Sequence, residues 1–448
     1  MTGLEIAGKH VLVVGMARSG LAALELLLQK GARVRATDVK PLDQLPDAAA
    51  ELARLGIQFQ VQSPEVFQGV QGIVISPGVP ADLPELAQAR GRGVPVIGEV
   101  ELAGYFLKGN TIGITGSNGK TTTTALAGHI LRQSGIPVQV GGNIGEAVTS
   151  MIPASRPDQW NVLELSSFQL ETIQSFHAHI AVALNVTPDH LDRHHTFEDY
   201  ARAKARLFQT QTAEDFAVLN ADDAVCLDYG RQTRARLLWF SANRALSPGV
   251  SLREEELCFD GQPFLNLREI PLRGRHNLEN TLAAAASAHL AGAPLEAMAA
   301  AVRTFPGVEH RLEFVRRIRG VDFYNDSKAT NVDAALKAVE AFPGGLWIIL
   351  GGKDKGAPYT PLRQPLAGKA RAALLIGAAA GKISGDLAGA VPLIHCGALE
   401  QAVNTAFREA APGDTVLLAP ACASFDQFSN FEHRGRVFKT LVAQLEAK

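Results

Sequence analysis

The sequence has almost no net charge, no long apolar run and no secretion signal. Its 448 residues carry 43 Lys and Arg against 45 Asp and Glu, a net charge of −2, so no basic surface favours nucleic acid and none is expected as a partner. The first ten residues lack the apolar core of a signal peptide. The richest apolar run, residues 282–293, is too short and alanine-rich for a bilayer, so no membrane span is expected.

Cysteine is also scarce. Four cysteines stand far apart in the sequence without any C-x-x-C pair: Cys226, Cys258, Cys396 and Cys422. This spacing speaks against a disulfide framework and against a cysteine zinc site. It is typical of a chain in a reducing compartment, so a cytoplasmic location is expected.

What remains is the composition of a globular α/β protein, with 46% hydrophobic and 20% charged residues. The length predicts several domains. Continuous β-branched runs alternate with helical segments in three blocks, which indicates parallel sheets covered by helices. We therefore predict a three-domain α/β fold, with a Rossmann-like domain at 1–98, a central α/β domain at 99–306, and a Rossmann-like C-terminal domain at 307–448.

The most informative segment is TGSNGKTT at 115–122, between an apolar strand candidate at 110–114 and a helical segment. Strand, glycine turn, Lys-Thr and helix form the layout of a phosphate-binding loop. Lys120 would add a cation and the Thr121 hydroxyl could bind Mg²⁺. Ile114 stands where the longer motif has its first glycine, so a capping turn before an ordinary helix is the alternative. The loop predicts that the central domain, 99–306, is of the P-loop ATPase type. The predicted ATP-binding loop comprises Gly116, Ser117, Asn118, Gly119, Lys120, Thr121 and Thr122.

The first block contains a weaker phosphate signal. The turn Gly15-x-Ala17-x-x-Gly20, with Asp38 after the next strand, imitates a dinucleotide fingerprint. Ala17 replaces the middle glycine, where a backbone must approach a pyrophosphate, and this weakens an NAD interpretation. The turn could hold another diphosphate, such as that of a nucleotide sugar, or it could be purely structural.

Polar residues follow two central strand candidates. Glu164 ends one of them, where a Mg²⁺ ligand is needed beside a phosphate loop, although it could instead be an acid at a helix start. Asp189 and His190 follow the next strand and suit Mg²⁺ or substrate contacts. His194 and His195 are predicted to be surface loop residues and not zinc ligands, because no cysteine stands near them in the sequence.

Other candidate turns follow strands of the third block, at 325–331, 351–356 and 420–428, and a fourth polar segment, 307–313, lies at the predicted linker. One such turn alone is usually a loop, but four are hard to explain by packing. Asp326, Lys328 and Thr330 in one turn can hydrogen-bond ribose, phosphate and an acidic substrate. Lys204 differs, since helical spacing alone predicts a solvated lysine there.

Taken together, these segments resemble the Mur ligase family, the ATP-dependent amide-forming enzymes of peptidoglycan synthesis, in order along the whole chain. The TGSNGKT loop, the strand ending at Glu164, the N-x-x-P-D-H segment at 185–190 and the H-N-x-x-N segment at 276–280 are general to that family. The segments 325–331, 424–428 and 431–435 resemble its D-glutamate-adding branch.

The resemblance implies UDP-N-acetylmuramoyl-L-alanine and D-glutamate as substrates, ATP and Mg²⁺ as cofactors, and a monomer that works in the cytoplasm. The three predicted domains would bind the UDP substrate, ATP and the amino acid in that order. ATP would phosphorylate the substrate carboxylate, and the amine of D-glutamate would attack the acyl phosphate.

The resemblance also implies roles for individual residues. The catalytic set is Lys120, Glu164, His190 and Lys204. The metal ligands are Thr121, Glu164, His190 and Lys204, the last as a carbamate. ATP contacts beyond the loop are Asn277, Asn280, Arg311 and Asp326. UDP-substrate contacts are Arg18, Ser19, Asp38, Gly78 and Asn143. D-glutamate contacts are Lys328, Thr330, Lys355, Ser424 and Phe425.

Two other functions remain open. A ligase like folylpolyglutamate synthetase also joins glutamate, but it takes a pterin substrate and lacks the UDP-type first domain. A nucleotide-binding protein that hydrolyses ATP without ligating anything would need only the phosphate loop.

Overall fold

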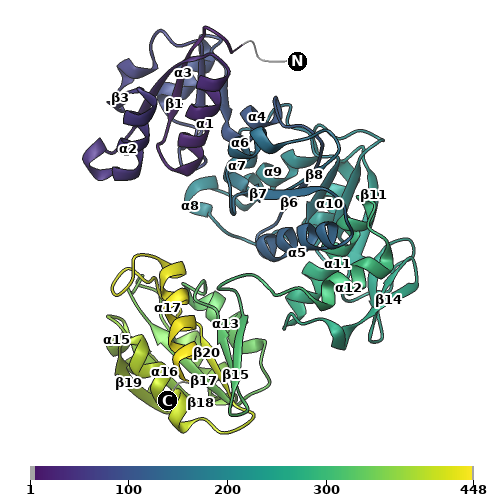
Figure 1. Ribbon diagram of the computed structural model, residues 1–448, viewed down its shortest axis with the longest axis vertical. Coiled ribbons are helices and arrows are strands. Elements are labelled where there is room, and N and C mark those ends of the chain that lie inside the picture. The colour runs from purple at the N-terminus through teal and green to yellow at the C-terminus, as the bar shows by residue number, and fades with distance from the viewer. Residues whose placement is uncertain (1–5, 446–448) are drawn as a thin grey trace. The chain divides into compact units, whose positions relative to one another are not determined.

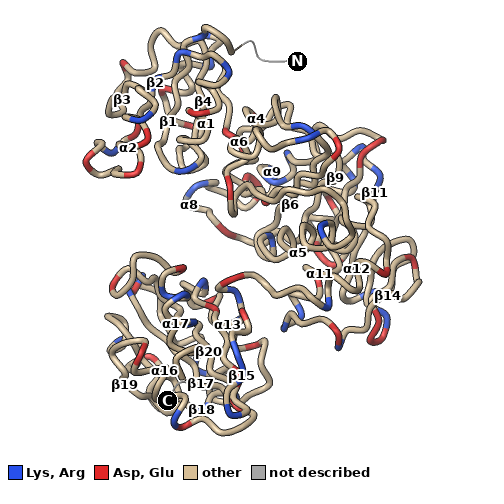
Figure 2. The backbone as a smooth tube through the Cα atoms, viewed as in Figure 1, with Lys and Arg blue, Asp and Glu red and all other residues tan. Residues whose placement is uncertain are grey.

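The computed structural model describes residues 6–445, whose strands form three sheets flanked by helices (Figure 1). This is the predicted three-domain α/β fold. The chain divides into two compact units, one containing the described residues up to Glu269 together with Leu278–Arg303, and the other containing Ile270–Asn277 and the residues from Thr304 onward. Both signs of charge are distributed along the whole chain (Figure 2).

The first sheet has five parallel strands in the order β3-β2-β1-β4-β5. Its strands are β1 (His10–Val14), β2 (Arg33–Asp38), β3 (Gln58–Val61), β4 (Gly72–Ile75) and β5 (Val96–Gly98). Its helices are α1 (Arg18–Gln29), η1 (Leu42–Gln44), α2 (Pro46–Leu55), η2 (Pro64–Phe67) and α3 (Pro84–Gly91). Val11 and Val13 enter one core cluster and Leu12 and Val14 another. A strand buried on both faces has no polar alternation, which explains the continuous apolar run.

The second sheet has nine strands in the order β14-β13-β12-β11-β10-β9-β6-β8-β7. They are β6 (Asn110–Thr115), β7 (Val138–Gly142), β8 (Trp160–Glu164), β9 (Ile180–Ala183), β10 (Phe216–Asn220), β11 (Arg236–Ser241), β12 (Val250–Arg253), β13 (Glu256–Phe259) and β14 (Gln262–Asn266). The pairs from β7 to β12 are parallel, whereas β12, β13 and β14 pair antiparallel. The sequence pattern did not predict this antiparallel extension.

Helices accompany the second sheet along the chain. They are α4 (Glu99–Gly104), α5 (Lys120–Gln133), α6 (Val148–Met151), η3 (Ile152–Ala154), α7 (Ser167–Leu170), α8 (Leu191–His194), α9 (Phe197–Ala205), η4 (Arg206–Phe208), α10 (Ala224–Gln232), η5 (Leu267–Glu269), α11 (Arg275–Leu290) and α12 (Leu295–Arg303). None of the helices in residues 6–445 is both long and apolar enough to cross a membrane.

The third sheet has six strands in the order β15-β16-β20-β17-β18-β19. They are β15 (Glu313–Ile318), β16 (Val321–Asn325), β17 (Leu346–Gly351), β18 (Ala370–Ile376), β19 (Leu393–Gly397) and β20 (Thr415–Leu418). Only the β15–β16 pair is antiparallel. The helices are α13 (Val332–Glu340), η6 (Thr360–Leu362), α14 (Arg363–Ala367), α15 (Ala380–Leu387), α16 (Leu399–Glu409) and α17 (Phe431–Gln444). Ile348 and Ile349 enter different core clusters, so this sheet also buries both faces.

Candidate active site

The predicted phosphate loop lies between β6 and α5. Gly119 precedes α5 with φ 86°, and a Cβ at this position would lie 2.1 Å from Oδ1 of Asn280. Only glycine satisfies both the left-handed backbone and the close approach. The Nζ of Lys120 folds back over the loop and donates to the carbonyl oxygens of Gly116 and Ser117 at 2.8 and 2.9 Å. Thr121 and Thr122 lie buried in the first turn of α5, whose N-terminal amides favour an anion.

The segment after β9 holds this loop in place. The carbonyl oxygen of Asn185 accepts from the amide of Ser117 at 2.8 Å, and its Oδ1 accepts from the amide of Asn118 at 2.8 Å. The Ser117 hydroxyl donates to the carbonyl of Thr187 at 2.9 Å and lies 3.0 Å from the Tyr200 hydroxyl. The loop is therefore preorganised by side chains that sequence reasoning did not single out, Tyr200 on α9 among them.

Lys204 is not the solvated lysine that helical spacing predicted. Its side chain is 1% exposed, and its Nζ donates to the carbonyl of Gly116 at 2.8 Å and lies 4.5 Å from the centre of the Tyr200 ring. Burial is the main cause that lowers the pKa of Lys204 well below its usual value, and the nearby Lys120 charge lowers it further. The prediction failed because α9 packs this face against the phosphate loop, a contact remote in sequence.

Glu164 lies at the end of β8, paired with Ile114 of β6 and with Gly142, the last residue of β7. Its carboxylate is buried, and Oε1 accepts from Nδ2 of Asn143 at 2.7 Å. Oε2 is buried and has no hydrogen-bond partner among the described residues. A buried carboxylate oxygen with no donor is costly unless a cation or donor arrives.

The histidines of the 190–195 segment differ from one another. His190 is exposed, with φ 53°, and its ring centre lies 4.8 Å from that of Phe168. His194 was expected on the surface, but its side chain is only 4% exposed. One ring nitrogen lies 3.0 Å from the Ser167 hydroxyl and the other lies 3.0 Å from Glu171. Burial is the main cause that lowers the pKa of His194. His195 is exposed as predicted.

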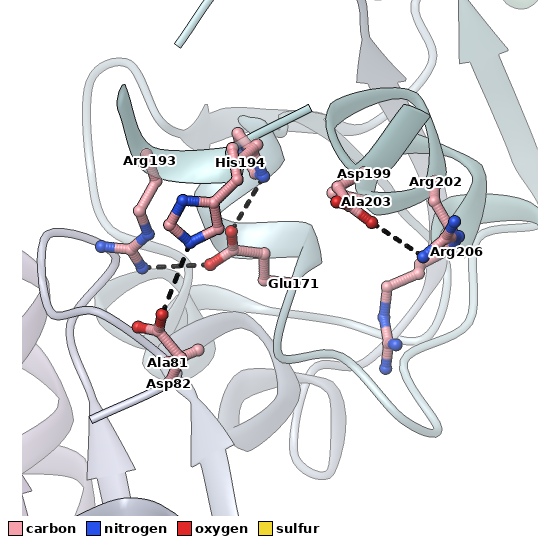
Figure 3. Close-up of a pocket in the computed structure, with 10 residues that line it drawn as sticks. Ala81, Asp82, Glu171, Arg193, His194, Asp199, Arg202, Ala203 and Arg206 are labelled. Carbon is pink, nitrogen blue, oxygen red and sulfur yellow. Dashed lines mark hydrogen bonds and ion pairs between the residues drawn. The ribbon is translucent and has the colours of Figure 1, made fainter. Parts of the chain in front are cut away.

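A pocket of about 270 Å³ lies beside these histidines. Arg193 and His194 both point toward the carboxylate of Glu171 (Figure 3). Arg193 also donates to the carbonyl of Val79 at 2.7 Å. Within residues 6–445, this pocket is lined by none of the residues proposed above for catalysis or binding.

In the first sheet, the predicted diphosphate turn follows β1. Both oxygens of Asp38 accept from backbone amides, those of Met16 at 2.7 Å and Lys40 at 3.0 Å. A Cβ on Gly20 would lie 1.9 Å from the carbonyl oxygen of Gly15, so α1 packs tightly against this turn. The candidates Arg18, Ser19 and Gly78 are at the start of α1 and after β4. Since the strand order reverses between β1 and β4, these candidates lie where an open α/β sheet binds ligands.

The two asparagines of α11 have different surroundings. Asn280 is 3% exposed, and its Oδ1 lies 3.3 Å from the Thr123 hydroxyl beside the phosphate loop. Asn277 belongs to the second unit, where its Nδ2 donates to the carbonyl of Arg273 at 2.7 Å.

In the second unit, the segment 310–312 meets the end of β16. The amide of Leu312 donates to Oδ1 of Asp326 at 3.2 Å. Burial raises the pKa of Asp326 to about 6, against a smaller lowering by this amide and by Arg311. His310 and Leu312 have φ values of 65° and 41°, a strained conformation for residues with side chains.

The candidate amino-acid residues lie on three turns that follow β16, β17 and β20, which are neighbours in the third sheet. The amide of Ala421 donates to the carbonyl of Ala329 at 2.9 Å, and the amide of Lys353 donates to that of Ala423 at 2.8 Å, so the three turns are in contact. The candidates differ in exposure: Ser424 is buried, Lys328 and Thr330 are half-buried, and Lys355 and Phe425 are exposed.

The sequence is similar to those of known proteins along nearly its whole length. Three domain families match consecutive parts of the chain: the Mur ligase MurD-like N-terminal domain at 9–98, the Mur ligase middle domain at 114–288, and the Mur ligase glutamate ligase domain at 310–422. The UDP-N-acetylmuramoylalanine–D-glutamate ligase of Solibacter usitatus is 63% identical over 99% of this chain and 100% of its own length. The chain belongs to the Mur ligase family. The ligase of the same name from Acidobacterium capsulatum is 54% identical over 98% of this chain and 97% of its own length.

Solved Mur ligases have the same fold. The UDP-N-acetylmuramate–alanine ligase of Thermotoga maritima superposes with a TM-score of 0.62 at 18% identity, over 98% of this chain and all of that one. A pseudomurein peptide ligase type C from Methanothermus fervidus gives 0.56 at 18% identity, over 98% of this chain and all of that one. At such identities the likeness concerns the fold alone.

Most of the candidate residues lie in the parts of the chain that match the three Mur ligase domain families. The first includes the Asp38 turn, the second includes the phosphate loop with Glu164 and Lys204, and the third includes Asp326 and Lys355. Ser424 and Phe425 follow the last matched residue, 422.

Proposed function

We propose that this Mur ligase is an ATP-dependent amide ligase that adds D-glutamate to UDP-N-acetylmuramoyl-L-alanine in peptidoglycan synthesis. The observation that carries the proposal is the 63% identity, over nearly the whole of both chains, with a ligase named for that reaction. The three domains that each match a Mur ligase family also support the proposal, because ATP hydrolysis alone does not require them.

The reaction is an acyl transfer through phosphate. An oxygen of the alanyl carboxylate attacks the γ-phosphorus of ATP, and ADP leaves. The amine of D-glutamate then attacks the acyl carbon and loses a proton, and the tetrahedral intermediate expels phosphate. Lys120 and the start of α5 would hold the phosphates in line for the first step, since charge develops there. Asn143 would position the carboxylate beside Glu164.

The proposed reaction also uses Mg²⁺. No three His, Cys, Asp or Glu side chains gather into a metal cage within residues 6–445. Mg²⁺ does not require such a cage, because it is held by one or two carboxylates together with substrate phosphates and water. The unpartnered Oε2 of Glu164 and the Thr121 hydroxyl fit that need, with His190 as a further ligand. When bound, Mg²⁺ would neutralise charge on the phosphates.

Lys204 would contribute a carbamate. A neutral lysine amine attacks CO₂, forms a C–N bond and releases one proton, which converts the neutral amine into a carbamate anion. The buried, low-pKa amine of Lys204 is suited to that reaction at neutral pH. The anion would then offset the charges of Lys120 and Mg²⁺.

Each of the three domains would bind a different substrate. Residues 1–98 would bind the UDP substrate with Arg18, Ser19, Asp38 and Gly78, residues 99–306 would bind ATP, and residues 307–448 would bind D-glutamate. Asn277, Asn280, Arg311 and Asp326 would contact the nucleotide, and Lys328, Thr330, Lys355, Ser424 and Phe425 the amino acid. The enzyme would act as a monomer in the cytoplasm, in keeping with its four cysteines outside any disulfide.

Phosphate release with one substrate omitted at a time tests this function. We expect release only when ATP, UDP-N-acetylmuramoyl-L-alanine and D-glutamate are all present, together with an amide product of the two acids. Release that needs ATP alone would identify a hydrolase. Release that needs a pterin and glutamate but no UDP compound would identify a folylpolyglutamate synthetase-like ligase.

A further inference from the structure

Arg434, on the first turn of α17, is one of the largest fully buried side chains in the described chain. Its guanidinium donates to two turns. Nε and one terminal nitrogen donate to the hydroxyl and carbonyl oxygens of Ser327, at 3.0 and 2.8 Å. The two terminal nitrogens donate to the carbonyl of Cys422 at 3.2 Å each, and one also reaches the carbonyl of Ala423 at 3.4 Å.

These partners are neutral backbone and hydroxyl oxygens. Arg434 forms no ion pair with any carboxylate in residues 6–445, and burial is the main cause that lowers its pKa to about 10. A buried cation without a direct ion pair is costly, so its hydrogen bonds supply the compensation together with the charge of Asp426, which raises the pKa of Arg434. The planar fork of five donors suits this task, because it can satisfy acceptors on two turns at once.

The turn after β17 also packs against the Arg434 guanidinium and the turn of Ala423. A Cβ on Gly352 would lie 2.3 Å from the Ala423 carbonyl oxygen and 3.2 Å from a terminal nitrogen of Arg434, and Gly352 has φ 139°. The glycine therefore lets the turn after β17 approach both the Arg434 guanidinium and the turn after β20. The neighbouring Lys353 amide bonds to the same Ala423 carbonyl at 2.8 Å.

We propose that Arg434 is a positioning residue for the amino-acid substrate. It fixes the turn of Ser327, which continues into Lys328 and Thr330, against the turn of Cys422 and Ala423, which continues into Ser424. This inference rests on the proposed function, because these turns carry the proposed D-glutamate contacts. Arg434 itself is fully buried behind them, so it acts through their spacing.

Substitution of Arg434 by Lys tests the proposal with the charge retained. An ammonium group has three donors and no fork, so it cannot bridge both turns. We expect the KM for D-glutamate to rise roughly tenfold or more, as for the loss of about 1.4 kcal/mol of binding. The KM values for ATP and the UDP substrate should change less than about twofold. Arg436→Lys, on the exposed side of the same helix, is the matched control and should leave all three KM values unchanged.

A purely structural role would give a different pattern. It would lower the melting temperature and the active fraction and leave the KM for D-glutamate unchanged, which would overturn the proposal. If Arg434→Lys does not fold, Ser327→Ala removes the hydroxyl that accepts from Arg434 Nε and donates to the carbonyl of Phe431. An unchanged KM for D-glutamate in that variant would also overturn the proposal.

Amide hydrogen exchange separates this proposal from the function on which it rests. In Arg434→Lys, exchange should become faster at both 326–330 and 421–425, and unchanged exchange would overturn the clamp itself. If the wild-type enzyme shows no turnover that depends on D-glutamate, the proposed function fails and the substrate role of Arg434 fails with it. Faster exchange at both turns would then still identify the clamp.

Discussion

At the scale of single residues, the proposed chemistry depends on two buried ionisable side chains, Lys204 and Glu164. Glu164 could be selected from the sequence because the end of a parallel strand beside a phosphate loop is a defined place. Lys204 could not be selected from spacing, because a lysine on an amphipathic helix usually faces water. Its burial depends on the packing of α9 against the loop at 116–119, 88 positions away in sequence at the Gly116 contact.

Substitution of Lys204 by Ala should reduce kcat by about 100-fold or more, the scale for a lost electrostatic group in an active site. Formate or acetate should restore part of the activity if the missing group is a carbamate anion. Arg202→Ala, at an exposed position of the same helix, should keep near-normal turnover. A fully active Lys204→Ala enzyme that does not respond to carboxylates would rule out this role.

Asp326 allows a prediction about stability and pH. Its pKa is about 6 in the folded chain against a usual 3.8, so the folded state binds the proton more tightly. The stabilisation from this carboxyl is therefore complete below pH 3.8 and is lost as pH rises through about 6. Asp326→Asn should raise the free energy of unfolding by up to about 3 kcal/mol at about pH 8, and by much less near pH 4. Urea unfolding at both pH values would check this, and an equal effect at both would contradict it.

At the scale of elements, the parallel strands were predictable and the antiparallel ones were not. The strand candidate at 110–114 is β6, Asn110–Thr115, because a doubly buried strand is a continuous apolar run. The strands β12 to β14 are only four or five residues long and are partly exposed. Their pairing depends on the edge offered by β11, which local pattern does not contain.

Two helical glycines give a matched test of element packing. A Cβ on Gly435 of α17 would lie 2.2 Å from Nδ1 of His310, whose ring is buried and held by Asn325 at 2.9 Å. Gly435→Ala should therefore destabilise the protein by about 1–3 kcal/mol. A Cβ on Gly385 of α15 would meet nothing within 4 Å, so Gly385→Ala should stabilise by about 0.5–1 kcal/mol. Urea midpoints compare the two variants, and equal shifts would contradict the packing account.

At the scale of the whole molecule, the proposed ATP contacts belong to two units of the chain. Lys120 and Asn280 belong to the first, and Arg311 and Asp326 to the second. If all four contact one nucleotide, the units must meet during turnover. Small-angle scattering should then show a smaller radius of gyration when an ATP analogue and the UDP substrate are added together. An unchanged radius with both bound would count against a shared site.

The most direct test of the central claim follows one oxygen atom. UDP-N-acetylmuramoyl-L-alanine would be prepared with ¹⁸O in its alanyl carboxylate and incubated with ATP, D-glutamate and the enzyme. Ligation through an acyl phosphate transfers one carboxylate oxygen to phosphorus, so each released phosphate should carry one ¹⁸O and each product amide should retain the other. Phosphate that carries no ¹⁸O would contradict the proposed reaction.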